Sequence, residues 1–340
     1  MAAARPTIRD VALHAGVSVA TVSYVLNGTR PVSSGRRERV RLAMADLGYE
    51  PNSAARGLKR RRAATIGLIV PDLRNQFFAE LAAGIEAAAA RRDVLLVLCS
   101  TNASAEREDY YARLLHGRRV DGVIYLSGTG LPPASLIALS ASEPVVFVDE
   151  RLPGVDVPFV GADNRSGARA LMAHVLAQGH RRIGVVGGPE GLWTAEQRMA
   201  GYREALAAAG LDPDALPAVP GDYTEATGAA AVDALLARDG LTAVVAANDL
   251  MAVGAMLRLR ERGLRVPADV SVAGFDDIPL ARALTPALTT VRQPAHAMGV
   301  AAGEALLARI EAPDQPVPAT RLAAELVVRD SVTPQERTQR

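Results

Sequence analysis

Apolar residues recur every three or four positions in three short stretches between residues 7 and 47, and turn-forming residues separate the stretches. Each stretch follows a residue that can cap a helix, namely Thr7, Ser18 and Ser33. The segment 14–17 contains a glycine turn, and Asn27-Gly28 ends the second stretch. Two short helices joined by such a turn are typical of a helix-turn-helix, and a third helix from Gly35 to Leu47 would close a three-helix core.

The pattern changes at residue 64, where short β-rich apolar runs begin to alternate with alanine-rich amphipathic stretches. The runs predict strands over Thr65–Val70, Val94–Ser100, Gly122–Tyr125, Val145–Val148, Phe159–Gly161, Ile183–Val186, Ala243–Ala246, Ser271–Gly274 and Thr289–Arg292. The amphipathic stretches predict helices over Phe77–Arg91, Glu106–Leu115, Ser166–Gln178, Ala195–Ala209, Glu225–Ala237, Met251–Arg262 and Met298–Ile310. This alternation favours parallel sheets covered by helices on both faces, and two successive series predict two doubly wound lobes.

These patterns divide the chain into segments, with the lobe boundary near residues 160–163 and a return into the first lobe near Gln293-Pro294. The expected segments are a helix-turn-helix domain (5–50), a hinge helix and linker (51–63), a first lobe (64–161 with 293–321), a second lobe (162–292 with 322–332) and a polar tail (333–340). In two-lobed architectures of this class the first-lobe faces form a two-fold dimer, and residues 331–340 contain no leucine heptad that could extend it to a tetramer, so we expect a dimer.

The charge is divided unevenly along the chain. Residues 1–62 contain twelve Lys/Arg and four Asp/Glu, a net charge of +8, whereas the remainder carries −7. A basic head on an acidic body indicates a polyanionic partner for the head alone. No apolar run is long enough to cross a membrane, no secretory signal is recognised, and the single Cys99 is expected to be a packed residue of a buried strand. We therefore expect a cytoplasmic protein.

In a helix-turn-helix the second helix enters the major groove of DNA with its early residues against base edges. The outward positions of this helix are Val19, Ala20 and Tyr24, because Val22 and Val25 are needed for packing. Val19 and Ala20 suit a thymine methyl group, and Arg30, just past the helix, could reach a guanine edge. The polar residues of the same helix are suited to phosphate oxygens, and these are Thr21, Ser23 and Asn27.

Asn52 can cap a further short helix in which Leu58 is the lone large apolar residue. So short a helix is marginal by itself in water, and it could order against DNA with Leu58 wedged between base steps in the minor groove. Alternatively, Leu58 packs on the body and the segment is a linker. The spacing alone favours neither.

Ligands of parallel sheets bind outside the carboxyl ends of the strands, and a cleft between two lobes commonly holds a small molecule. The polar and aromatic candidates at such positions are Phe77, Phe78, Asp149, Arg198, Asn248 and Asp276. Carboxylates, an amide and a guanidinium beside aromatic rings suit a polyhydroxylated ligand. Asp163 and Asp249 are interpreted as helix caps. Trp193 either lines the cleft or anchors its loop.

Several motifs carry a family resemblance, and these are Thr7-Ile-Arg-Asp-Val-Ala12, Gly16-Val-Ser-Val-Ala-Thr-Val-Ser23, Val25-Leu-Asn27 and Gly48-Tyr-Glu-Pro-Asn52 followed by Ala55-Arg-Gly-Leu58. They closely resemble the lactose/galactose-repressor (LacI/GalR) family of bacterial regulators, and the match continues through nearly the whole chain. The resemblance implies a periplasmic-binding-protein-like body and a palindromic operator bound by a dimer. It also implies that Leu58 and Lys59 enter the minor groove from a hinge helix that orders on DNA. Tyr24 departs from the arginine or histidine common in relatives, so the half-site preference cannot be carried over.

The resemblance also implies an effector site, formed by the positions of Phe77, Phe78, Asp149, Thr194, Arg198, Tyr223, Asn248 and Asp276. The arginine, the asparagine and the two acids kept at these positions resemble a sugar pocket more than a purine pocket. Trp193 lies beside Thr194 in this loop. The expected function is that of a sugar-controlled repressor.

Two other classes of protein fit the sequence less well, an enzyme and a solute-binding protein. An enzyme is disfavoured because no catalytic triad order, phosphate-binding loop with lysine or metal-ligand cluster is recognised, and no cofactor is expected. A solute-binding protein of a transporter would share the two-lobed body. The N-terminal head and the lack of a recognised secretory signal argue against it.

Overall fold

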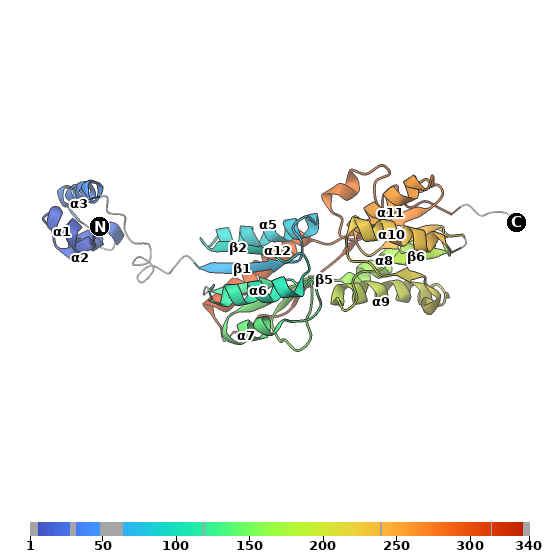
Figure 1. The fold of residues 1–340 in the computed structure, drawn as a ribbon, viewed down its shortest axis with the longest axis horizontal. Helices are drawn as coiled ribbons and strands as arrows, with labels where there is room; N and C mark the ends of the chain where they lie inside the picture. Colours follow the sequence, from blue (N-terminus) through green and yellow to red (C-terminus); the bar gives the residue numbers. More distant parts are fainter. Residues whose placement is uncertain are drawn as a thin grey trace. The chain divides into compact units, whose positions relative to one another are not determined.

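The computed structural model describes residues 6–27, 32–47, 64–117, 120–238, 240–313 and 315–335. The chain forms two compact units, the head (Met1–Ala63) and the body (Ala64–Arg340). Each unit is described separately (Figure 1).

The head contains α1 (Ile8–His14), α2 (Val19–Asn27) and α3 (Ser34–Asp46). Thr7 and Asp10 form a capping box at α1, in which the Asp10 carboxylate accepts from the Thr7 backbone N–H at 2.7 Å. The core is closed by valines from all three helices, since Val11, Val22 and Val40 are fully buried. The three helices predicted for the head are therefore present. Ser33 is the N-cap of α3 as predicted, but its backbone carbonyl, not its hydroxyl, accepts from Arg36 and Arg37.

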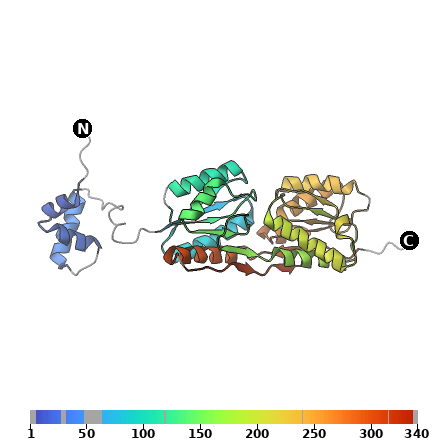
Figure 2. The ribbon, with the colours of Figure 1, turned by 90° about the horizontal axis from the view of Figure 1, so that it is seen from below.

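The first part of the body, here called the N-lobe, is built on a six-stranded parallel sheet. In spatial order its strands are β11 (Thr320–Leu322), β5 (Phe159–Ala162), β4 (Val145–Val148), β3 (Gly122–Tyr125), β1 (Thr65–Val70) and β2 (Leu95–Ser100). Alternate residues of β1 face opposite ways: Ile66 and Leu68 pack with α5 (Gln76–Ala90) and α12 (Ala295–Glu311), and Ile69 packs with α6 (Ala105–Gly117) and α7 (Ala134–Ser142). Helices therefore cover both faces of the sheet (Figure 2).

The second part, the C-lobe, is built on a four-stranded parallel sheet. Its strands in spatial order are β7 (Ala218–Val219), β6 (Ile183–Val186), β8 (Ala243–Ala246) and β9 (Ser271–Ala273). Its helices are α8 (Asn164–Ala177), α9 (Trp193–Ala208), α10 (Glu225–Leu236) and α11 (Asp249–Glu261). The pair α8 and α9 packs on one face of the sheet and the pair α10 and α11 on the other. The prediction of parallel sheets wrapped on both faces is confirmed.

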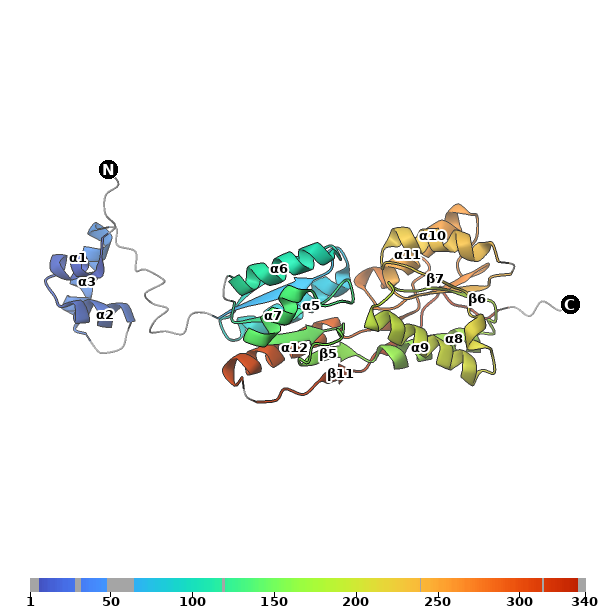
Figure 3. The ribbon, with the colours of Figure 1, turned by 60° about the horizontal axis from the view of Figure 1, so that its bottom comes forward.

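The chain passes between the lobes three times. It leaves the N-lobe sheet after β5, returns at α12, and leaves again after β11. The last helix, α12, lies beside the N-lobe strands although the C-lobe sheet and its four helices precede it in sequence (Figure 3). Two of the crossing segments pair with each other as the antiparallel strands β10 (Thr290–Arg292) and β12 (Glu325–Val327). The short 3₁₀ segments are Pro213–Ala215 and Pro279–Arg282.

One predicted strand is in a different environment from the one expected. β2 is an edge strand, not a buried one, because it pairs only with β1, and Leu95 is 60% exposed. Cys99 alone fits the expectation, since its side chain is buried. Four elements had not been predicted, namely α7, β7, β11 and β12. The three strands have two or three residues each, too few to show a period.

Candidate functional site

The first turn of α2 presents small apolar side chains to solvent. Val19 is 43% exposed and Ala20 is exposed, whereas Val22 on the same helix is fully buried. Ser18 precedes the helix, and its hydroxyl accepts from the Thr21 backbone N–H at 3.1 Å. Thr21, Ser23 and Tyr24 are half-buried. The helix thus offers the predicted apolar positions at the end expected to meet DNA.

Some predicted DNA contacts fall outside the described residues. These are Arg30, Leu58, Lys59 and the side chain of Asn27. Their roles at bases, phosphates and the minor groove stay predictions.

The body contains a cavity of about 590 Å³ between the two lobes, which we call the cleft. The segments that line it follow strand carboxyl ends: 71–75 follows β1, 102–103 follows β2, 126–128 follows β3 and 149–150 follows β4. The C-lobe contributes Pro189, Leu192, Asp222, Tyr223, Thr224, Glu225 and Leu250. Of the predicted effector residues, Phe78, Asp149 and Tyr223 line the cleft directly.

Arg198 lies directly behind this lining, where it is buried and fully engaged. Its Nε donates to Asn164 Oδ1 at 2.8 Å, its Nη1 donates to the Ala247 carbonyl, and Nη1 lies 3.5 Å from Asp276 Oδ1. The guanidinium carbon also lies 4.0 Å from the ring centroid of Phe275. Burial alone would lower the pKa of Arg198, but Tyr223, Asp276 and Asp149 raise it above its ordinary value. Arg198 is therefore a permanent cation that organises the polar floor of the cleft.

Glu150 links the two lobes at the cleft. Its carboxylate, on the loop after β4, accepts from the backbone N–H of Thr194 at 3.1 Å and from the Thr194 hydroxyl. The same hydroxyl lies 3.3 Å from the Tyr223 hydroxyl. Thr194 therefore contacts the cleft lining from behind, through its hydrogen bonds to Glu150 and its contact with the Tyr223 hydroxyl.

Three buried acids at and behind the lining, Asp149, Glu150 and Asp276, are harder to ionise than ordinary carboxyls. Burial raises the pKa of Asp149 and of Asp276, and Arg198 offsets only part of the effect. Burial also raises the pKa of Glu150, and the adjacent Asp149 raises it further, against the hydrogen bonds from Thr194. Such perturbed groups gathered in a cleft mark a functional-site candidate.

The backbone is strained around the cleft. Among the described residues, four non-glycine residues that line it have left-handed φ values, namely Asn102, Ala103, Asp149 and Tyr223. Such conformations cost about 1–3 kcal/mol each and persist where the surrounding structure imposes them. They cluster at binding sites, which supports the cleft as the functional site.

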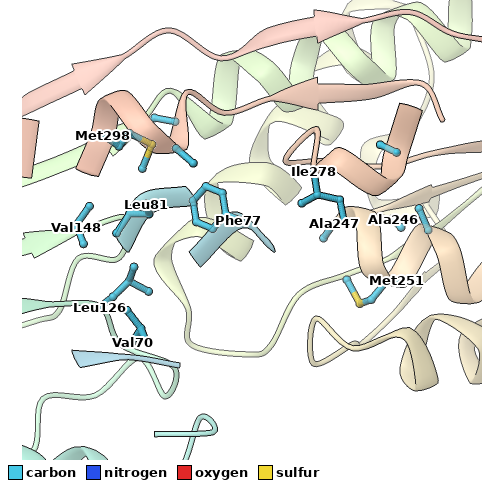
Figure 4. Packing of buried hydrophobic residues seen from close by; sticks show 14 of the residues in the cluster. Val70, Phe77, Leu81, Leu126, Val148, Ala246, Ala247, Met251, Ile278 and Met298 are labelled. Atoms are coloured by element: carbon cyan, nitrogen blue, oxygen red, sulfur yellow. The ribbon is translucent and has the colours of Figure 1, made fainter. Parts of the chain in front are cut away.

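Phe77 and Asp276 lie away from this lining and border a second cavity of about 410 Å³. Phe77 is buried in the apolar cluster shared by the lobes, between Leu81 of the N-lobe and Ile278 of the C-lobe (Figure 4). The Asp276 carboxylate accepts from Gln293 Nε2 at 2.8 Å and faces Arg198. The two residues therefore support the cleft from behind.

Trp193 does not line the cleft, and the structure favours the alternative of a loop anchor. Its ring meets Phe159 edge-on, with the ring centroids 5.4 Å apart. The guanidinium carbons of Arg151 and Arg321 lie 5.7 and 5.9 Å from its ring centroid. Trp193 therefore fixes the start of α9 against the N-lobe.

The assignment of helix caps is corrected at α11. Asn248, not Asp249, is the N-cap, since Asn248 Oδ1 accepts from the Met251 N–H at 2.9 Å. Asn248 also donates to the Tyr223 carbonyl at 3.1 Å and so holds the cleft loop. The buried Asp249 instead accepts from Thr290 and from the Ile278 N–H. Asp163 caps α8 as predicted.

Sequence reasoning missed six polar residues of the lining: Glu150, Asn102, Ser127, Asp222, Thr224 and Glu225. The first three lie two residues after predicted strands, so the strand-end rule could have included them. The other three follow β7, which had not been predicted. The Ser127–Gly128 loop is positioned by the buried Glu108, whose carboxylate accepts from the Gly128 N–H at 2.7 Å.

Within the described residues, no group of His, Cys, Asp and Glu could hold a metal ion. The described helices include none that is long and apolar enough to cross a bilayer.

Comparisons with known proteins agree with this architecture. Residues 7–52 match the bacterial regulatory proteins of the lacI family, and residues 172–332 match the periplasmic binding protein-like domain. The HTH-type transcriptional regulator CelR of Thermobifida fusca is 38% identical over 335 residues, covering 96% of this chain and 98% of the relative.

Two solved structures extend the likeness to the fold. A transcriptional regulator CelR–cellobiose complex has a TM-score of 0.72 at 36% identity, covering 96% of this chain and 100% of that one. The lac repressor dimer bound to operator and the anti-inducer ONPF has a TM-score of 0.81 at 29% identity, covering 97% and 100%.

A helix-turn-helix head joined to a two-lobed body with a ligand cleft defines a class of DNA-binding transcriptional regulators. The chain belongs to the LacI family of bacterial regulatory proteins within that class. Its relatives are regulators of transcription, and it is not an enzyme.

Proposed function

We propose that the protein is a repressor that binds a palindromic operator as a dimer and is controlled by a saccharide in the cleft. The observation that carries the proposal is a saccharide-sized cleft in a chain whose head exposes the first turn of α2. The N-lobe is proposed to include residues 293–321 and the C-lobe residues 322–332. A regulator that binds chromosomal DNA would work in the cytoplasm.

On DNA, α2 lies in the major groove with Val19, Ala20 and Tyr24 at base edges and Arg30 nearby. Thr21, Ser23 and Asn27 bind phosphates, and Leu58 with Lys59 enters the minor groove. The charge of +8 on residues 1–62 supports this placement. Affinity is then expected to fall steeply with salt, by about 10³ between low and moderate concentrations if several phosphates are neutralised.

In the body, the aromatic rings of Phe78 and Tyr223 provide faces for a sugar, and Asp149 can accept from its hydroxyls. A cavity of about 590 Å³ suits a mono- or disaccharide. The cellobiose complex of a similar regulator supports this ligand class. The lining is held in position from behind by Thr194, Arg198, Asn248 and Asp276. Phe77 and Trp193 hold the two lobes together.

The dimer is proposed to form along the edge of the N-lobe sheet. β2 exposes Leu95, Val97 and Leu98, an apolar row that is unusual on a sheet edge in contact with water. A second copy of this chain would cover the row. The similar lac repressor structure is a dimer on its operator.

The proposal is tested by selecting bound sequences from a random duplex library with the full chain. We expect enrichment of one palindromic site, and loss of binding at least about tenfold when Leu58 is replaced in Leu58→Ala. A library that remains unenriched after repeated rounds would overturn the proposal.

A further inference from the structure

The charge of the cleft is strongly unbalanced. Five carboxyl side chains line it, and these are Asp72, Asp149, Glu150, Asp222 and Glu225. Among the described lining residues, Arg74 is the one basic side chain, and it is bound to Asp72, with Nη2 2.9 Å from Oδ2. The lining therefore holds no unpaired cation for a phosphate or carboxylate of a ligand.

Two of these acids are buried side by side at the end of β4. Asp149 and Glu150 are 5% and 3% exposed, in contrast to the exposed Asp222 and Glu225. Glu150 is satisfied by the two donors of Thr194. Asp149 Oδ1 is buried and has no hydrogen-bond partner within the described structure. A buried acceptor without a donor is costly, so this oxygen favours a ligand that brings a donor group into the cleft.

The nearby guanidinium does not balance the acids. Arg198 is the buried cation of this cluster, and its contacts are with Asn164, the Ala247 carbonyl and Asp276. One positive charge thus faces three buried carboxyls, those of Asp149, Glu150 and Asp276. Buried charges require partners of opposite sign or must be neutralised by protons.

We infer that the effector is an amino saccharide whose primary ammonium group binds between Asp149 and Glu150. The inference rests on the proposed saccharide function of the cleft. An ammonium group has three donors and one charge, so it can satisfy Asp149 Oδ1 and balance the second carboxylate at once. A neutral sugar supplies a hydroxyl donor to Asp149 but no positive charge that would let Glu150 release its proton. Phosphorylated sugars are repelled.

The test compares matched saccharides on the full chain at pH 7. The probes are glucosamine, N-acetylglucosamine, glucose and glucose 6-phosphate, with cellobiose and its diamino analogue as the disaccharide pair. Binding is followed by calorimetry and by the fluorescence of Trp193, the single tryptophan of the chain, which adjoins Thr194. We expect each amino saccharide to bind at least about tenfold more tightly than its neutral and N-acetylated partners, and the phosphate to bind weakest.

Glu150→Gln tests the placement, because it removes the carboxyl that can become charged opposite the ammonium group and keeps an acceptor for Thr194. The variant should bind amino and neutral partners within about twofold of each other. The matched control is Glu86→Gln, at an exposed position on α5, which should keep the full preference. If Glu150→Gln does not fold, calorimetry of the wild type in two buffers measures the protons released on binding and so tests the placement of the ammonium group. Amino saccharides should release protons from the acid pair and neutral ones should not.

The outcomes separate this inference from the proposed function. Neutral saccharides that bind as tightly as amino ones would overturn the inference and leave the saccharide cleft intact. A preference that survives in Glu150→Gln, or amino-saccharide binding without proton release, would also overturn it. Absence of binding by every probe would overturn both.

Discussion

At the residue scale, Arg198 holds the cleft together. Its removal in Arg198→Ala would leave Asp276 and Asp149 buried without a cation, so the body should lose about 3–5 kcal/mol of unfolding free energy. The control is Arg203→Ala, at an exposed position on the same helix, which should change stability by less than about 0.5 kcal/mol. Urea unfolding of the full chain measures both. Equal effects of the two substitutions would contradict this role.

Glu150 should make stability depend on pH in a defined direction. Burial and Asp149 raise its pKa to about 8 in the folded chain, so the folded state keeps a proton that the unfolded chain loses near pH ~4.3. Its contribution is therefore fully present at acidic pH and is lost as the pH rises through about 8. The unfolding free energy of the wild type relative to Glu150→Gln should fall by up to about 1.4 kcal/mol per pH unit between pH ~5 and ~8. Parallel pH profiles would show that Glu150 is not the group concerned.

The strand-end rule predicted cleft residues such as Asp149 from the sequence. It could not show that Arg198 and Asn248 stand behind the lining, because that depends on how far each helix start lies from the cavity. Trp193 illustrates the same limit. Its loop position is visible in the sequence, but its partners Phe159 and Arg321 are distant in the chain.

At the element scale, glycines allow the helix pair α5 and α12 to pack closely within the N-lobe. A Cβ at Gly299 of α12 would lie 2.1 Å from the Leu81 carbonyl oxygen of α5. Gly299→Ala should therefore force the two helices apart and destabilise the body by about 1–3 kcal/mol. In contrast, Gly117→Ala at the end of α6 meets nothing within 4 Å and should be neutral or slightly stabilising. Thermal unfolding of both variants measures the difference, and a neutral Gly299→Ala would contradict the close packing.

Most helices and strands were predictable because the helices show a hydrophobic period and the strands are continuous apolar runs. The two- and three-residue strands β7, β11 and β12 were not, since pairing with neighbours defines them. The burial of β2 was misjudged for a related reason. An apolar run looks the same at the centre and at the edge of a parallel sheet, and only the strand order places β2 outermost.

At the scale of the whole molecule, the apolar edge of β2 should control assembly. Leu95→Glu would place a charge in the proposed interface, so the dimer should dissociate at least about tenfold more readily. Ile137→Glu changes another exposed apolar residue, on α7, and serves as the control. Sedimentation across a concentration series measures the equilibrium. Dissociation by Ile137→Glu but not by Leu95→Glu would place the interface elsewhere.

Control of DNA binding from the cleft requires a ligand that prefers one arrangement of the lobes. The contacts that join the lobes beside the cleft include those of Glu150 with Thr194 and of Trp193 with Phe159. A ligand that engages Asp149 and Glu150 acts directly beside these contacts. The central claim is that occupation of the cleft changes the affinity of the head for its operator.

The most direct test is fluorescence anisotropy of the selected operator, titrated with the full chain at fixed salt. The titration is done without ligand and with a saturating concentration of the tightest-binding saccharide. The account predicts an operator affinity that changes at least about tenfold with ligand and that no longer changes in Arg198→Ala. An operator affinity identical with and without a saccharide that is bound in the cleft would contradict it.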